Sequence, residues 1–250
     1  MAVILKTTEQ IAIMREAGRI LAHGLRATVA AVRPGISTDE LDVVFEKTIR
    51  ELGATPCFLG FEGYPKSICT SINDEVVHGI PAANRILKNG DSIGIDVGVE
   101  YNGYCADMAE TVAVGSISAE AVQLLRATES AMYAGIEACV AGNTIGDIGA
   151  AVSAVAKEYG FGVVTQLVGH GIGTSMHEEP AVPNYGKAGA GIPLEVGMVL
   201  AIEPMFTTGK HHVAFDEDGW TVRTVDGSLA AQFEHTVAIT ENGPVILTVI

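Results

Sequence analysis

The sequence repeats itself at a constant offset, and this duplication constrains the fold more than any other feature. Residues of the same type recur 107 positions apart and in the same order, beginning with Gly35 and Gly142. Self-similarity at a fixed spacing is typical of a duplicated structural unit. We therefore expect two halves of similar structure, at about residues 8–114 and 115–221, within one domain of residues 1–250.

Each half has the same order of elements. A long helical pattern is followed by a second, shorter one that ends at Gly53 or Gly160, and glycine is the usual residue just past a helix. Strand patterns come next. The sequence thus predicts an α+β fold whose halves are related by a pseudo-twofold axis and share one sheet. We expect helices at residues 8–32, 38–52, 118–140 and 145–159, and strands at 92–99, 103–114, 198–206, 220–224, 233–240 and 245–249.

Charge and composition exclude several classes of protein. The 250 residues include 15 Lys and Arg against 30 Asp and Glu, so the net charge of −15 disfavours binding to nucleic acid or to anionic membranes. No apolar stretch reaches the length of a membrane span, and the apolar start is too short for a secretory signal. The four cysteines form no CxxC pair, which fits reduced thiols. We expect a cytoplasmic protein.

The duplication also makes a chemical prediction. Asp96 and Glu203 are separated by the repeat offset, and both lie in apolar strand patterns. A twofold axis would place them on two sides of one central point, where two carboxylates repel each other unless a cation lies between them.

Further candidate ligands surround this pair. Asp107 lies 11 residues after Asp96, His170 lies in the glycine-rich stretch GHGIG, and Glu234 follows an apolar strand pattern. Each carboxylate taken alone fits an internal salt bridge or a strand end that reaches solvent, but the few basic residues cannot pair with all of them. Four carboxylates and one imidazole suit Mn, Fe, Co or Zn. We predict two divalent ions bridged by Asp107 and Glu234, with Glu203 as a further ligand.

Such a site would perform hydrolysis, because two bridged ions lower the pKa of a shared water and polarise a carbonyl. Histidines that are not ligands then become candidates for binding the substrate. We expect His78 and His177 to donate hydrogen bonds to the scissile amide or the developing oxyanion. A structural or surface role is the alternative for His78, and it is the expectation for His23, His211, His212 and His235.

Seven motifs spread in order over nearly the whole chain resemble the type I methionine aminopeptidases, which belong to a wider family with creatinase and prolidase. Together they are far more specific than any single glycine motif. They are GYPKSIC (63–69), NDEVVHGIP (73–81), the segment 90–96, GHGIG (169–173), HEEP (177–180), IEP (202–204) and QFEHT (232–236).

The resemblance implies a fold, an activity and a set of roles. The fold would be the duplicated "pita-bread" α+β domain of creatinases and aminopeptidases, with a curved central antiparallel sheet covered by helices. The activity would be removal of the initiator Met from nascent proteins with a small second residue, by attack of a metal-bridging hydroxide. Glu203 would transfer protons, and the substrates would be nascent chain ends at the ribosome. Apart from the resemblance, a monomer is the simplest expectation, and the acidic charge predicts no direct contact to nucleic acid.

By the same resemblance, the dinuclear site would be Asp96, Asp107, His170, Glu203 and Glu234. His78 and His177 would contact the substrate. The pocket for the methionine side chain would be lined by Phe58, Phe61, Tyr64, Cys69, Met176 and Trp220, and an apolar lining that contains sulfur suits a thioether.

The chain departs from the family pattern around this pocket. Met176 stands where Phe is usual, Phe61 where Tyr is common, and Gly98 where Thr is typical, while Tyr104-Cys105-Ala106 replaces Phe-His-Gly. These departures concern the shape of the pocket and leave the ligand set intact.

Two other functions stay open. One is an Xaa-Pro dipeptidase or creatinase-like hydrolase. The chain starts directly at the catalytic repeat, and this argues against that alternative. The other is a non-catalytic binding module, which would be expected to have lost ligands. The 25 residues between His177 and Glu203 leave no room for the insertion of type II enzymes.

Overall fold

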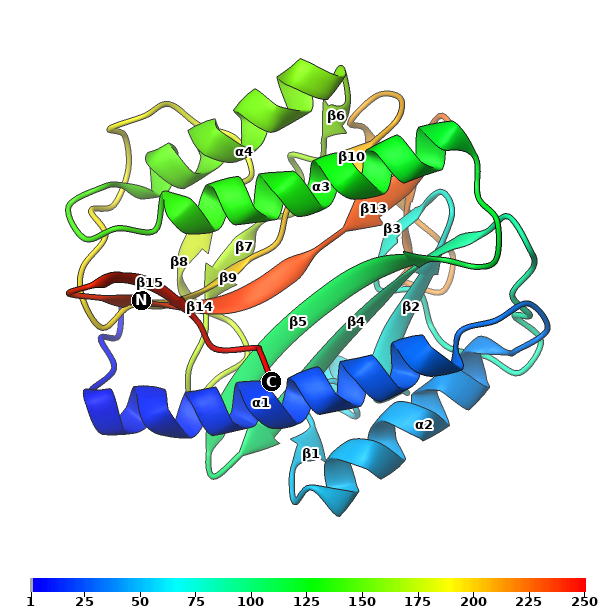
Figure 1. The fold of residues 1–250 in the computed structure, drawn as a ribbon, viewed down its shortest axis with the longest axis horizontal. Coiled ribbons are helices and arrows are strands. Elements are labelled where there is room, and N and C mark those ends of the chain that lie inside the picture. The colour runs from blue at the N-terminus through cyan, green and yellow to red at the C-terminus, as the bar shows by residue number, and fades with distance from the viewer. Residues whose placement is uncertain (1) are drawn as a thin grey trace.

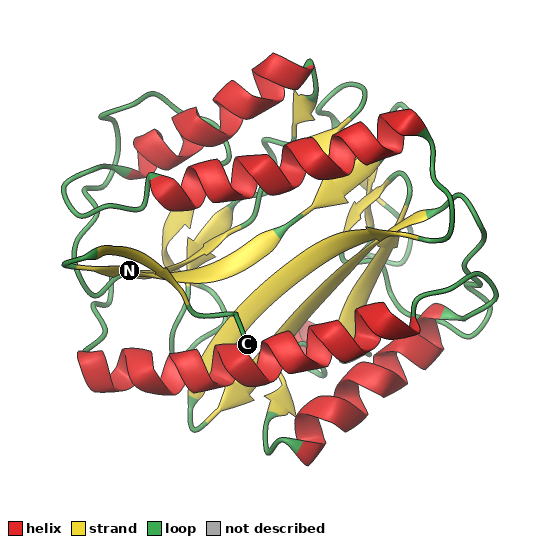
Figure 2. Cartoon of the chain, viewed as in Figure 1, coloured by secondary structure: helices red, strands yellow, loops and turns green. Residues whose placement is uncertain are grey.

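The computed structural model describes residues 2–250, and in it two pairs of helices flank a curved antiparallel sheet (Figures 1 and 2). The helices are α1 (Thr8–Ala31), α2 (Thr38–Glu51), α3 (Ala119–Glu137) and α4 (Ile145–Tyr159), with a short 3-10 turn η1 (Phe61–Gly63). The strands are β1 (Thr55–Pro56), β2 (Ile68–Ile72), β3 (Glu75–Val77), β4 (Ser92–Tyr101), β5 (Tyr104–Ala113), β6 (Gly162–Val163), β7 (Gly169–Gly171), β8 (Glu178–Val182), β9 (Val199–Ile202), β10 (Met205–Thr207), β11 (Val213–Phe215), β12 (Val222–Thr224), β13 (Ala230–Gln232), β14 (Glu234–Thr240) and β15 (Gly243–Ile246).

The helix boundaries follow from capping residues. Thr7 precedes α1, Ser37 precedes α2 and Thr144 precedes α4, and each forms a reciprocal capping box with the third residue of its helix. Such a box satisfies two backbone N–H groups that the helix itself leaves without acceptors. Helix α4 ends at Gly160 in the left-handed conformation, which glycine adopts without steric cost. The four predicted helices are confirmed to within three residues at each end.

The main sheet has nine strands in the order β1-β4-β5-β14-β9-β7-β8, with β2 also paired to β4 and β15 to β14. Its pairings are antiparallel. Two smaller sheets, β13-β10-β6 and β11-β12-β3, adjoin it. Helix α1 lies beside β4 and β5, and α2 lies beside α1, β1 and β2, whereas α3 and α4 lie beside the strands of the second half (Figure 1).

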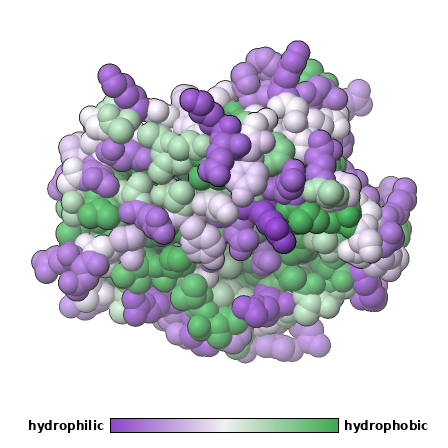
Figure 3. Space-filling model, turned by 45° about the horizontal axis from the view of Figure 1, so that its top comes forward, coloured by the Kyte–Doolittle hydropathy of each residue, from purple (hydrophilic) through white to green (hydrophobic). Residues whose placement is uncertain are grey.

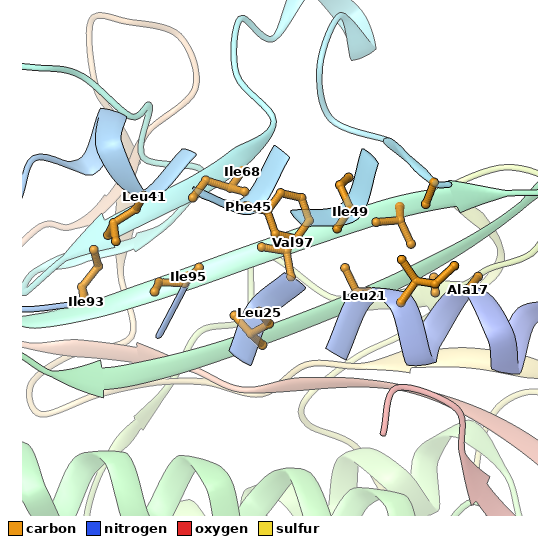
Figure 4. Packing of buried hydrophobic residues seen from close by; sticks show 14 of the residues in the cluster. Ala17, Leu21, Leu25, Leu41, Phe45, Ile49, Ile68, Ile93, Ile95 and Val97 are labelled. Carbon is orange, nitrogen blue, oxygen red and sulfur yellow. The ribbon is translucent and has the colours of Figure 1, made fainter. Parts of the chain in front are cut away.

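Alternation along β4 separates the core from the site. Ile93, Ile95 and Val97 point to one face, where they pack with Phe45 and other buried side chains of α1 and α2 (Figure 4). Full burial of each such side chain contributes about 1.5–3 kcal/mol to folding. Successive residues of a strand point to opposite faces, so Asp96 lies on the other face. The core thus fixes the face on which this carboxylate lies.

Three predicted strands were wrong in detail. The predicted strand 198–206 is divided in two by Glu203 and Pro204, because proline donates no backbone hydrogen bond and β10 pairs with β13 and β6 in a separate sheet. The predicted strand 245–249 instead runs over Gly243–Ile246, and the backbone N–H of Leu247 turns back to the carbonyl of Thr236. The predicted strand 220–224 is shortened to Val222–Thr224.

The surface is polar and charged with apolar side chains between, as the face in Figure 3 shows. In residues 2–250, no helix combines the length and the apolar character that crossing a membrane would need.

Candidate metal centre

The five predicted ligands lie around a single cavity at the middle of the sheet. Asp96 and Asp107 come from the β4–β5 hairpin, where the hydrogen-bonded register sets Asp96 opposite Ala109. Glu234 is also opposite Ala109, but on the β14 side of β5, and His170 on β7 pairs with Ala201 on β9. Sheet register therefore gathers residues that are far apart in the sequence. Glu203 completes the group from the break between β9 and β10.

The side chains of this cluster are close enough to share a cation. One donor atom each from Asp107, His170 and Glu234 lies within 4.8 Å of the others. The Nε2 atom of His170 is 3.7 Å from Oδ2 of Asp107 and 3.6 Å from Oε1 of Glu203. The other ring nitrogen, Nδ1, is 2.9 Å from the carbonyl oxygen of Gly171, a contact that suits an Nδ1–H donor and leaves Nε2 free as a ligand.

The cluster lacks an internal counter-charge. Oδ1 of Asp96 and Oε1 of Glu234 are buried without a hydrogen-bond partner among residues 2–250, and in the same residues no Lys or Arg forms an ion pair with the four carboxylates. Buried anions are stable only when a partner compensates them. Two unpartnered oxygens beside an imidazole are the donors expected for hard or borderline divalent ions. These residues therefore fit a divalent metal centre.

Burial and mutual repulsion change the acidity of every group in the cluster. Burial raises the pKa of Asp96 to about 7. Burial, and then the neighbouring carboxylates, raise the pKa values of Asp107 and Glu234 well above the ordinary range, and burial and Asp96 do the same for Glu203. Burial lowers the pKa of His170 to about 4. A neutral imidazole and strongly destabilised carboxylates are the state that a divalent cation would stabilise.

Polar residues that we did not predict form hydrogen bonds with the predicted ligands. Nε2 of Gln232 donates to Oε2 of Glu203 at 3.3 Å, and Nδ2 of Asn184 donates to the Glu203 carbonyl at 3.0 Å. The hydroxyl of Thr236 accepts from the backbone N–H of Asp107 and donates to its carbonyl. Gln232 and Thr236 lie inside the QFEHT motif, so the motif was a signal for them, whereas nothing in the sequence pointed to Asn184.

A cavity of about 500 Å³ opens in front of the cluster. Every residue that we predicted to bind the substrate lines it, and the lining also includes residues we did not predict. The predicted ones are Phe58, Phe61, Tyr64, Cys69, His78, Met176, His177 and Trp220, and the additional ones include Glu62, Val77, Gln166, Leu167, Val168, Glu178, Glu179, Ala181 and Met205.

Aromatic contacts shape one wall of the cavity. The rings of Tyr64 and Trp220 meet edge to face, with centroids 5.0 Å apart, and the Tyr64 hydroxyl donates to the carbonyl of Ile68. His177 lies with its ring 5.5 Å from Phe61 and 4.4 Å from His170. His177 therefore stands between Phe61 of the apolar wall and the predicted ligand His170.

His78 is held in an uncommon backbone conformation, with φ of +61°. The next residue, Gly79, lies so close to Thr70 that a Cβ would be only 2.1 Å from the Thr70 carbonyl oxygen. The close packing at Gly79 restrains the backbone and keeps His78 at the cavity. Burial lowers the pKa of His78 to about 4 and also lowers the pKa of His177, so both imidazoles are neutral near pH 7.

Two of the departures from the family pattern, Gly98 and Met176, lie against each other. A Cβ at Gly98 would be 2.5 Å from Cε of Met176 and 2.8 Å from Cε1 of Phe58. These distances are shorter than van der Waals contact, so a side chain at position 98 would displace the ends of Met176 and Phe58. The shape of this part of the pocket thus depends on the packing of Gly98, Met176 and Phe58.

The remaining histidines and cysteines lie outside the ligand set. His235 is buried, and its Nδ1 is 2.7 Å from the Thr248 hydroxyl, whereas His211 and His212 are exposed. All four cysteines are free thiols, and those of Cys57 and Cys105 contact each other with their sulfurs 3.5 Å apart.

Four carboxylates and an imidazole that are buried or nearly so, with neutral histidines beside a cavity of about 500 Å³, define the class of metal-dependent hydrolases. Within that class the chain belongs to metallopeptidase family M24, whose sequence profile matches residues 12–241. The predicted family and enzyme class are therefore confirmed, and with them the dependence on divalent metal.

Named relatives within this family show which of its enzymes the chain is similar to. The chain is 48% identical to the methionine aminopeptidase of Clostridium acetobutylicum over 98% of both chains. Its structure resembles that of the methionine aminopeptidase from Rickettsia prowazekii with a TM-score of 0.97, at 39% identity over 99% of this chain and 100% of the other. The prolidase from Pyrococcus furiosus is less similar, with a TM-score of 0.77 and 27% identity over 99% of this chain but 66% of the other. These likenesses confirm the predicted pita-bread fold.

Proposed function

We propose that this chain is a methionine aminopeptidase that removes the initiator Met from nascent proteins with a small second residue. The observation that carries the proposal is the position of the cluster: buried carboxylates with unpartnered oxygens lie at an apolar cavity of about 500 Å³. That volume suits a methionine side chain and the following peptide bond. The full-length similarity to methionine aminopeptidases supports the same substrate.

In this proposal Asp96, Asp107, His170, Glu203 and Glu234 would hold two divalent ions. When bound, the ions activate water for attack and polarise the scissile carbonyl. Mn, Fe, Co and Zn all suit the donor set.

The other residues bind, orient and exchange protons. His177 and His78 are neutral, so each offers one N–H donor to the substrate, and His177 stands where it would stabilise the developing oxyanion. Oε1 of Glu203 would hold the proton that is transferred to the leaving amine, while Gln232 fixes its second oxygen. The wall that contains Tyr64 and Trp220 would exclude water from the methionine side chain.

Metal-stripped protein tests the proposal when it is assayed on Met-Ala-Ser and on an Ala-Pro dipeptide, with Mn, Co, Fe and Zn added in turn. We expect release of Met, only with metal, and no cleavage of Ala-Pro. Cleavage of Ala-Pro without release of Met would instead support the dipeptidase function. Cleavage of neither peptide with any of the four metals would support a non-catalytic module.

We also propose how the protein works in the cell. The protein would be a single catalytic domain, with repeats at about 8–114 and 115–221, that acts as a monomer in the cytoplasm. Its four free cysteines fit a reducing compartment, and its net charge of −15 disfavours binding to RNA. It would meet nascent chain ends as they leave the ribosome without binding RNA itself. Light scattering on the purified protein tests the monomer, and cosedimentation with ribosomes at two salt concentrations tests the encounter.

A further inference from the structure

A buried ion pair joins the segment before α1 to the edge of the cavity. Nζ of Lys6 donates to Oε2 of Glu178 at 2.6 Å and to the carbonyl of Ile4 at 3.1 Å. The two paired side chains are only 3% and 6% exposed. Burying two charges costs several kcal/mol per ion before their attraction offsets it, so a pair of this kind adds little net stability. The position of the ion pair therefore says more about its role than its contribution to stability does.

The second oxygen of the same carboxylate holds the loop of residues 173–177. Oε1 of Glu178 accepts from the backbone N–H of Ser175 at 3.2 Å and from the hydroxyl of Thr174 at 3.5 Å. The carbonyl of Gly173 in turn accepts from the backbone N–H of Cys105 on β5 at 2.7 Å. Glu178 thus connects Lys6 to a loop whose other end is attached to the hairpin that carries Asp107.

Two glycines make room for this connection. A Cβ at Gly173 would lie 2.5 Å from both Cε of Lys6 and Oε1 of Glu178. A Cβ at Gly197 would lie 2.9 Å from the carbonyl oxygen of Lys6, whose N–H donates to the Gly197 carbonyl at 2.7 Å. Gly173 is the last residue of the GHGIG motif. The predicted metal site gives no reason why this position should be a glycine. The buried lysine accounts for it.

The held loop presents two residues to the cavity. Met176 lies against Phe58 across Gly98, and His177 lies between Phe61 and His170. We propose that Lys6, acting through Glu178, positions His177 and Met176 against the substrate. Lys6 itself does not line the cavity, so it is a positioning residue. This inference rests on the proposed aminopeptidase function.

A double-mutant cycle between Lys6→Met and His177→Ala tests the proposal, because it measures whether one residue acts through the other. In the otherwise native protein, Lys6→Met should lower kcat/KM on Met-Ala-Ser by about tenfold to a hundredfold, since small misplacements of binding groups have effects of this size. In the His177→Ala background the same change should cost clearly less, because only the part of its effect that passes through Met176 remains. Mn²⁺ stoichiometry should stay unchanged.

Val152→Ala is the control for a purely structural effect. Val152 is fully buried on α4, away from the cavity lining, so this variant loses stability and should keep its kcat/KM. Glu178→Gln is the second variant if Lys6→Met fails to fold, since it keeps an acceptor for Ser175 but removes the charge. Hydrogen exchange of the 173–178 peptide in metal-free protein should be faster in Lys6→Met than in Val152→Ala.

The outcomes separate the two proposals. Equal losses from Lys6→Met in both backgrounds, or no loss in the native one, would overturn the positioning role. If the unmodified protein releases no Met with any metal, the proposed function fails, and the hydrogen-exchange comparison then decides the positioning role alone. Exchange in the 173–178 peptide that is no faster in Lys6→Met than in Val152→Ala would overturn it.

Discussion

Replacement of Asp96 by Asn should stabilise the metal-free protein at alkaline pH, although it removes a metal ligand. Burial raises the pKa of Asp96 from 3.8 to about 7. A carboxyl whose pKa is higher in the folded state contributes stability below its unfolded pKa and loses it as the pH rises through the folded value. The rise corresponds to about 4 kcal/mol lost from the free energy of unfolding by pH 8. Asn at this position cannot ionise and does not incur that loss.

The neighbouring groups act in the same direction. The charge of Asp96 also raises the pKa values of Asp107, Glu203 and Glu234, so its removal relieves them as well. A difference of about 4 kcal/mol corresponds to roughly 8–16 °C in melting temperature for a domain of this size. At pH 4.5 Asp96 is protonated in the folded protein, and most of the difference should disappear.

Thermal unfolding of the native and Asp96→Asn proteins in a chelating buffer at pH 4.5, 6 and 8 measures this effect. The same measurement is then repeated after the chelator is replaced by Mn²⁺. Comparing the two proteins at each pH cancels the contributions of the buried histidines, which they share. Added Mn²⁺ should reverse the order, because only the unmodified protein keeps the full ligand set and is stabilised by binding. An Asp96→Asn protein no more stable than the native one at pH 8 in chelator would refute the reasoning.

Three further predictions concern single residues. Gly98→Ala should raise KM for Met-Ala-Ser with a smaller effect on kcat, because its new methyl group displaces the pocket wall at a cost of about 1–3 kcal/mol; steady-state kinetics measures this. His177→Ala should lower kcat/KM about 10²–10³-fold with unchanged Mn²⁺ stoichiometry by calorimetry, and an unchanged rate would exclude its role in stabilising the oxyanion. Phe45→Ala should cost about 3–5 kcal/mol in urea unfolding and leave KM unaltered, since its ring packs on the face of β4 opposite the site.

The helices were the most predictable part of the fold. Thr7 and Ser37 act as caps, and Gly160 ends α4, so local chemistry decides each boundary. The short strands of the second half were less predictable because pairing partners decide them. The break at Pro204 shows the difference: an apolar run reads as one strand, but its ends belong to two sheets.

The candidate site was predictable where residue type and the internal repeat indicate it. The repeat offset links Asp96 to Glu203, and burial of unpaired carboxylates points to a cation. Contacts across the fold were not predictable, because side chains distant in sequence meet only after the sheet has formed. Asn184 on Glu203, and Lys6 on Glu178, are examples.

Titration of metal-free protein with Mn²⁺, while release of Met from Met-Ala-Ser is followed, tests the central claim most directly. The account predicts no release in chelator, full release after metal is restored, and at most residual release from Asp107→Asn at any metal concentration. Undiminished release in chelator, or from Asp107→Asn, would contradict it.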